Sequence, residues 1–235
     1  MKKTVINWSG GKDSALMLNR IIDEGIYKPE CLLTTVNSEN NRISMHGVPV
    51  ELLKQQAEST GLPLVIIEIP GTVSMDQYNS IMQNELDKIR QIGIEYSAFG
   101  DIHLEDLRDY KEDQTLKAGF KPIFPLWKED TSKLMHEFID TGLKAVIVST
   151  NAKYLGKEFP GRIFDRDLLA SLPENVDPAG ENGEFHTFVY DSPDFSAPIN
   201  YQIGETILKD YSNDDDTEKP YDTKFWYLDL MHNRT

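Results

Sequence analysis

The residues best suited to binding or catalysis form a glycine-rich segment near the amino terminus, Ser9-Gly10-Gly11-Lys12-Asp13-Ser14. A short apolar run precedes it and an amphipathic run follows, so we expect it to join a strand to the first turn of a helix. Helix amino termini attract anions through unpaired N–H groups, and glycine lets a backbone approach a phosphate closely. Two serine hydroxyls and Lys12 complete a predicted phosphate cradle, in which Asp13 holds Mg²⁺ or orders the loop.

This segment differs from the Walker A loop. That pattern requires a glycine where Ile6 stands, and a serine or threonine where Asp13 stands. A tight turn that caps a helix is the structural alternative, but the serines, the lysine and the aspartate together favour phosphate binding.

A second segment whose side chains could bind or catalyse is Gly180-Glu181-Asn182-Gly183-Glu184-Phe185-His186-Thr187. Its glycines allow a tight loop that carries two carboxylates, those of Glu181 and Glu184. Carboxylates that face phosphates can bind Mg²⁺, orient ammonia or accept a proton from ammonium. The alternative is an Asn-Gly hairpin turn before a strand.

Two further predicted strands end in residues that could meet a ligand. Val36 ends the second strand, and Gly100-Asp101-Ile102 ends the fourth. Ligands of open α/β sheets bind beyond the carboxyl ends of the strands, so we expect backbone near Val36 to meet the adenine or ribose, and the Asp101 carboxylate to face the site. Glu105, Asp109 and Glu112 share one face of a predicted helix, which is typical of a solvated surface.

Four blocks in order resemble the diphthine–ammonia ligase family and its bacterial relatives among the N-type ATP pyrophosphatases. They are Ser9–Ser14, Arg42–Pro49, Gly100–Ile102 and Gly180–Thr187. The resemblance spans roughly residues 3–200 and implies a sheet domain that binds ATP, with Mg²⁺ as cofactor, and a carboxyl-terminal domain that closes the site. It also implies a nucleotide contact for His46 and a substrate contact for Arg108.

The expected site follows from these blocks and from the resemblance. The residues expected to bind the nucleotide are Ser9, Gly10, Gly11, Lys12, Asp13, Ser14, Val36, His46, Gly100, Asp101 and Ile102. The residues expected to act in catalysis are Lys12, Asp13, Glu181, Asn182, Glu184 and His186, with Asp13 as the metal ligand.

The activity that the resemblance implies is an amidation that forms AMP and pyrophosphate. A substrate carboxylate, small or protein-borne, attacks the α-phosphate of ATP, and free ammonia then displaces AMP from the acyl-adenylate. Tyr110 and His186 depart from the diphthine-specific pattern, so the same chemistry on another carboxylate, such as a corrinoid-related acid, is the first alternative. A non-catalytic adenine-nucleotide sensor is the second. A tRNA thiolase or lysidine synthetase is disfavoured by the lack of cysteines and by the charge.

Alternating strand and helix patterns position these blocks. Short apolar runs at 4–8, 31–36, 64–69, 96–99 and 145–149 predict buried parallel strands, and amphipathic stretches between them predict helices. This order predicts an α/β fold with a doubly wound, mostly parallel sheet, Rossmann-like and similar to the adenine nucleotide alpha hydrolases. A smaller α+β domain follows it.

We expect three regions along the chain: an ATP-binding domain over 1–130, a smaller domain over 131–211, and an acidic connector with an aromatic tail over 212–235. Asn213–Glu218 predicts a solvated or disordered connector. Phe225–Leu228 is too apolar to stay in solvent, so we expect a terminal strand or a contact in a homodimer.

Charge and composition exclude several classes. The 235 residues carry a net charge of −15, which disfavours nucleic acids and anionic membranes as partners. The single cysteine, Cys31, excludes a disulfide framework and a Cys₄ zinc site. A mean hydropathy of −0.45 and the lack of a long apolar run predict a cytoplasmic protein.

Overall fold

The fold was analysed in a computed structural model that describes residues 1–43, 46–211 and 223–232. The first sheet holds five parallel strands in the order β4-β2-β1-β5-β6. Their bounds are β1 Lys2–Asn7, β2 Tyr27–Asn37, β4 Leu64–Ile69, β5 Tyr96–Ala98 and β6 Lys121–Ile123. A two-residue strand, β3 (Arg42–Ile43), pairs antiparallel with the end of β2.

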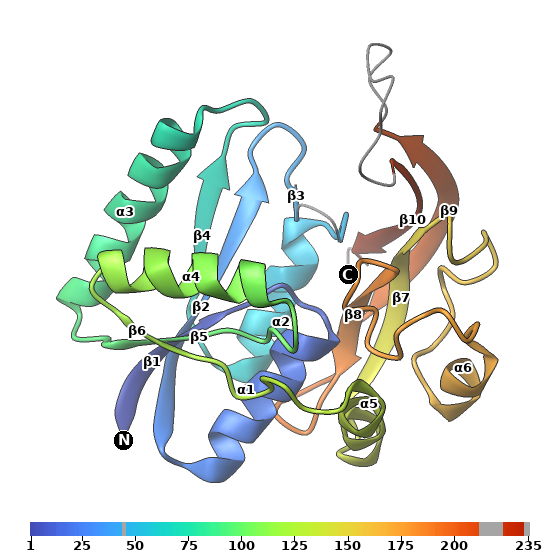
Figure 1. Ribbon diagram of the computed structural model, residues 1–235, viewed down its shortest axis with the longest axis horizontal. Helices are drawn as coiled ribbons and strands as arrows, with labels where there is room; N and C mark the ends of the chain where they lie inside the picture. Colours follow the sequence, from blue (N-terminus) through green and yellow to red (C-terminus); the bar gives the residue numbers. More distant parts are fainter. Residues whose placement is uncertain (44–45, 212–222, 233–235) are drawn as a thin grey trace.

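Helices cover both faces of this sheet (Figure 1). They are α1 (Lys12–Glu24), α2 (Val50–Thr60), α3 (Met75–Gln91) and α4 (Glu105–Lys117). Successive residues of β1 enter different apolar layers: Ile6 packs in the layer of α1 and α2, and Val5 packs in the layer of α3. Both layers exclude water, which explains why the strands are continuously apolar rather than alternating.

A second, antiparallel sheet has the strand order β8-β7-β10-β9. Its strands are β7 Lys144–Asn151, β8 Phe185–Asp191, β9 Tyr201–Asp210 and β10 Lys224–His232, accompanied by α5 (Thr131–Asp140) and α6 (Arg166–Ser171). Leu16 of α1, Ile147 of β7 and Leu228 of β10 belong to one continuous hydrophobic core. The two sheets are therefore packed together (Figure 1).

The predicted fold class is confirmed, with one misplaced strand. The run 145–149 forms the middle of β7, which pairs antiparallel with β8 and β10 rather than joining the parallel sheet. Ala145 to Thr150 are all fully buried, and a strand buried on both faces has the same sequence pattern in either kind of sheet.

Other outcomes concern short or terminal segments. β6 was not predicted, because three residues that include Pro122 carry too little pattern. The terminal strand predicted at Phe225–Leu228 is confirmed as part of β10, whereas the acidic run Asn213–Glu218 lies outside the described residues. Within the described parts of the chain, no helix is both long and apolar enough to cross a membrane.

Candidate functional site

The glycine-rich segment joins β1 to α1, as its sequence predicts. Gly11 is the N-cap of α1 and has no side chain to cap it, but the Thr187 hydroxyl accepts from the Lys12 amide in the first turn at 3.0 Å. Ser9 and Ser14 approach each other across the loop with their hydroxyl oxygens 3.2 Å apart, and the Ser14 hydroxyl donates to the Gly11 carbonyl at 2.9 Å. The first turn of α1 therefore opens toward the cavity with the hydroxyls and the helix dipole that suit a phosphate.

Gly10 is held in the left-handed region, with φ +76°. Its carbonyl accepts hydrogen bonds from the Val189 amide of β8 (2.8 Å) and from the Gln56 side chain (3.0 Å). The Gln56 amide oxygen accepts from the Trp8 indole at 2.9 Å. A Cβ at Gly10 would lie 2.7 Å from that oxygen, so both conformation and packing require glycine here.

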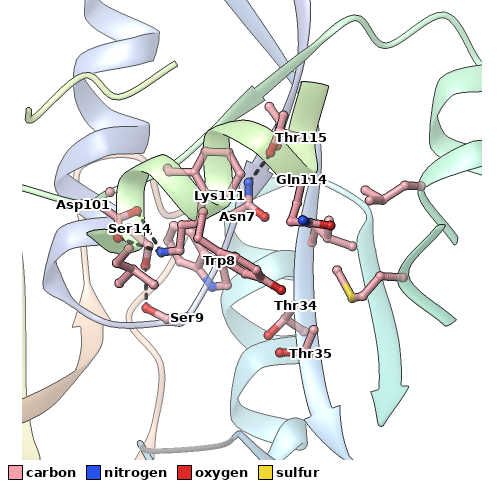
Figure 2. Close-up of a pocket in the computed structure, with 18 of the residues that line it drawn as sticks. Asn7, Trp8, Ser9, Ser14, Thr34, Thr35, Asp101, Lys111, Gln114 and Thr115 are labelled. Carbon is pink, nitrogen blue, oxygen red and sulfur yellow. Dashed lines mark hydrogen bonds and ion pairs between the residues drawn. The ribbon is translucent and has the colours of Figure 1, made fainter. Parts of the chain in front are cut away.

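Two lysine–aspartate pairs lie at the loop and opposite it. The Lys12 ammonium contacts both Asp13 carboxylate oxygens at 2.9 Å and is almost fully buried. Lys111 of α4 contacts the Asp101 oxygens at 2.6 and 2.9 Å (Figure 2). Burial raises the pKa of Asp13, which Lys12 opposes and the charge of Asp101 reinforces. A cation between the two aspartates would relieve this cost.

The Gly180–Thr187 segment brings only one of its two carboxylates to the cavity. Glu181 lines it, and one Glu181 oxygen accepts from the backbone amides of Ile102 (2.9 Å) and His103 (3.3 Å). Burial is the main cause that raises the pKa of Glu181. These bonds join the second sheet to the end of β5.

Glu184 is buried inside its own loop. Its carboxylate accepts from the amides of Asp177 (3.0 Å) and Asn182 (2.9 Å), and from the Asn182 side chain (3.1 Å). It does not line the cavity. Its contacts fix the shape of the loop that presents Glu181.

His46 and His186 lie with their rings 4.6 Å apart and both line the cavity. The Thr187 carbonyl lies 3.1 Å from His46 Nδ1, so this nitrogen carries the proton in the neutral ring and Nε2 is left as an acceptor. His186 Nε2 is buried without a hydrogen-bond partner in the described part of the chain. Burial lowers the pKa of His46 to about 4 and that of His186 well below its ordinary value.

A cavity of about 620 Å³ lies beyond the carboxyl ends of β1, β2 and β5. Figure 2 shows its polar margin, where Ser9, Ser14, Asp101 and Lys111 meet. The side chains of α3 and α4 add an apolar and aromatic wall with some amides, formed by Tyr78, Met82, Gln83, Leu86, Leu107, Tyr110 and Gln114.

The structure brings most of the predicted residues to this cavity. Those that line it are Ser9, Asp13, Ser14, His46, Gly100, Asp101, Glu181 and His186. Gly10, Gly11 and Lys12 form the loop behind that lining, and Ile102 contributes its backbone amide to Glu181. Asn182 supports Glu184 rather than facing the cavity.

Two predicted residues lie elsewhere. Val36 is buried where β2 pairs with β3, and Thr34 and Thr35 line the cavity instead. The Arg108 guanidinium stacks on the rings of Phe124 and Trp127, at 5.0 and 4.5 Å from their centroids, and does not line the cavity.

Sequence reasoning missed Lys111, Gln114 and Tyr78. The only signal for Lys111 was its position on a helix that follows Asp101, in a run interpreted as a solvated face. Tyr78 and Gln114 carry no motif, and only the packing of α3 and α4 brings them together.

Comparisons with known proteins show the family of this chain. Residues 1–122 match the model of the diphthamide synthase N-terminal domain, and residues 130–218 match that of the diphthamide synthase C-terminal domain. The chain therefore belongs to the diphthamide synthase family, as its motifs indicated, and is an ATP-dependent ligase.

Individual relatives are named diphthine–ammonia ligase. A diphthine–ammonia ligase of Danio rerio is 27% identical over 229 residues, covering 85% of this chain and 86% of that protein. One of Schizosaccharomyces pombe is 26% identical over 213 residues, covering 81% of this chain but only 34% of that longer protein. Among solved structures, a predicted subunit of tRNA methyltransferase from Methanocaldococcus jannaschii aligns with a TM-score of 0.44 and 18% identity, over 82% of this chain and 98% of that one.

Proposed function

We propose that this chain amidates a carboxylate with ammonia and converts ATP to AMP and pyrophosphate. One observation carries the proposal: the phosphate loop, the strand ends and the Glu181 loop line a single cavity. Relatives are named for diphthine and ammonia, and a diphthine-like or other carboxylate is the acceptor here.

The phosphate loop stabilises the negative charge that develops in the first step. Attack of the carboxylate on the α-phosphate breaks the α–β bond and leaves an acyl-adenylate and pyrophosphate. Ser9, Ser14 and the first turn of α1 hold the departing pyrophosphate by hydrogen bonds. Lys12 neutralises its developing charge, because such transfers depend chiefly on positioning and electrostatics.

Asp13 and Asp101 could supply part of the ligand set of Mg²⁺. Both line the cavity, and the charge of Asp101 adds to the raised pKa of Asp13. No group of three or more His, Cys, Asp or Glu side chains that could hold a metal occurs among the described residues. The protein would supply one or two oxygens, and the nucleotide phosphates and water the rest, which is the usual pattern for this ion. When bound, Mg²⁺ would withdraw charge from the phosphate oxygens.

The amine is handled beside Glu181, close to the phosphate loop, since the charges of Asp13 and Lys12 both act on the Glu181 carboxyl. Glu181 can accept hydrogen bonds from ammonium and take its proton, since a carboxylate whose pKa is raised is a better base. The two neutral imidazoles of His46 and His186 add no positive charge there, so they do not repel an ammonium ion. Ammonia then attacks the acyl carbon and AMP leaves.

The test is product analysis with ATP, Mg²⁺, ammonium and a panel of carboxylates that includes diphthine-like peptides. We expect AMP, pyrophosphate and amide in equal amounts, and ADP with orthophosphate would contradict the proposal. Lys12→Met should abolish pyrophosphate release, whereas Lys54→Met at an exposed position of α2 should leave it unchanged. Glu181→Gln should bind ATP normally and form no amide, which separates a ligase from a nucleotide sensor.

A further inference from the structure

The outer strand of the second sheet has an open edge. β9 pairs with β10, and within residues 1–43, 46–211 and 223–232 no strand pairs with its other side. Large apolar side chains are exposed along it: Ile203 is 56% exposed, Ile207 45% and Leu208 46%. Long, apolar edges of this kind recruit another strand unless something prevents it.

The register with β10 shows which backbone groups face that edge. The Tyr211 amide donates to the Thr223 carbonyl at 2.9 Å, and Ile207 and Lys209 stand opposite Tyr227 and Phe225. Backbone groups alternate in direction along an antiparallel strand. The N–H and C=O groups of Thr206 and Leu208 therefore point to the open edge.

We propose that β9 pairs antiparallel with β9 of a second copy of this chain, about a two-fold axis at Ile207. Thr206 then lies opposite the partner's Leu208, and the two symmetric pairs make four main-chain hydrogen bonds with the groups that already point outward. The two sheets become one continuous eight-stranded sheet across the dimer. Ile207 of each copy meets its counterpart at the centre.

Charge complementarity favours this register. Glu205 and Lys209 are four residues apart and both exposed, so pairing centred on Ile207 places Glu205 opposite the partner's Lys209, and Lys209 opposite the partner's Glu205. Centring on Thr206 or Leu208 also suits the backbone directions, but places Glu205 opposite an isoleucine or a tyrosine. Opposite charges across an antiparallel pair are stabilising, and like charges are destabilising.

A bulge that contains Glu205 lies at one end of the proposed paired segment, 205–209. β9 takes three steps from Ile203 to Thr206, whereas β10 takes two from Leu228 to Leu230. A bulge bends a strand and disrupts its ladder. The regular ladder of β9 runs from Thr206 to Asp210. It therefore holds Lys209 and the outward-pointing groups of Thr206 and Leu208, whereas Glu205 lies in the bulge beside it.

The test is the oligomeric state of the full chain, measured by sedimentation velocity from about 1 to 200 µM. We expect a dimer that Glu205→Lys weakens roughly tenfold or more, because two attractive pairs become repulsive. Lys209→Glu should do the same. The double variant Glu205→Lys with Lys209→Glu should restore the dimer, since each pair again joins opposite charges. Glu174→Lys, an exposed charge outside the sheet, is the matched control.

Three results would overturn the proposal. The first is a monomer at every concentration, as expected if another segment of the same chain covers the edge. The second is a dimer whose affinity Glu205→Lys leaves unchanged, and the third is a double variant that dimerises as weakly as the single variants. Thermal unfolding of each variant shows that it is folded. The measurement needs neither ATP nor an acceptor, so it stands or falls separately from the proposed ligase activity.

Discussion

Replacing Glu184 by glutamine tests whether this carboxylate acts by holding the Glu181 loop in place. Glu184 is 1% exposed. One of its oxygens accepts from the Asp177 amide and the Asn182 side chain, and the other accepts from the Asn182 amide. Glutamine has the same shape, but it turns one acceptor into a donor that faces an N–H group.

The magnitude follows from these contacts. A hydrogen bond to a charged group contributes about 1.5–3 kcal/mol, and an unsatisfied buried donor costs a further 1–3 kcal/mol or so. One bond is lost and two lose their charge. We therefore expect Glu184→Gln to lower the free energy of unfolding by about 3 kcal/mol.

Urea unfolding measures this loss, and Glu174→Gln at an exposed position should change the unfolding free energy by no more than about 0.5 kcal/mol. ATP affinity should stay close to that of the wild type, because Glu184 does not line the cavity, whereas amide formation should fall as the Glu181 loop loosens. A Glu184→Gln protein of wild-type stability that cannot form amide would refute the positioning role and indicate direct catalysis.

Two further expectations rest on local geometry. In urea unfolding, Gly10→Ala should lower the unfolding free energy by more than Gly25→Ala does. Both glycines have positive φ, and alanine in that conformation costs about 1 kcal/mol. Only the methyl group at Gly10 would also meet a buried side chain, at 2.7 Å. Equal losses would contradict this reasoning. The pKa of His46 is about 4 in the folded chain, so the unfolded chain binds more protons between pH 6.5 and 4. As the pH is lowered from 6.5 to 4, the unfolding free energy should therefore decrease by up to about 1.4 kcal/mol per pH unit. His46→Gln should flatten this slope and His232→Gln, at an exposed position, should not.

Sequence patterns sufficed where one local property decides the structure. The glycines and serines after β1 predicted a loop that leads from a strand into a helix, because the φ of Gly10 and the hydroxyls of Ser9 and Ser14 are properties of those residues alone. The apolar runs of β1, β2, β4 and β5 predicted a doubly wound sheet for the same reason, since a strand covered on both faces must be apolar throughout.

Sequence patterns failed where the outcome depends on distant packing. Glu181 and Glu184 have the same charge and lie in one glycine-rich loop, yet only Glu181 faces the cavity. The turn at Gly183, with φ +83°, reverses the chain between them, and no pattern shows which carboxylate will point inward. The end of the second strand was placed correctly, but Val36 does not line the cavity, because it is buried where β3 pairs with the end of β2.

The bond between the Gly10 carbonyl and the Val189 amide of β8 has a consequence for how the two halves of this chain can change. The glycine-rich loop is encoded toward one end of the gene and its main-chain support toward the other. An exchange of either half with a distant relative must keep the position of β8 to within a fraction of an ångström, or the Gly10 carbonyl loses a hydrogen-bond donor. Recombination between such genes should therefore preserve both halves together.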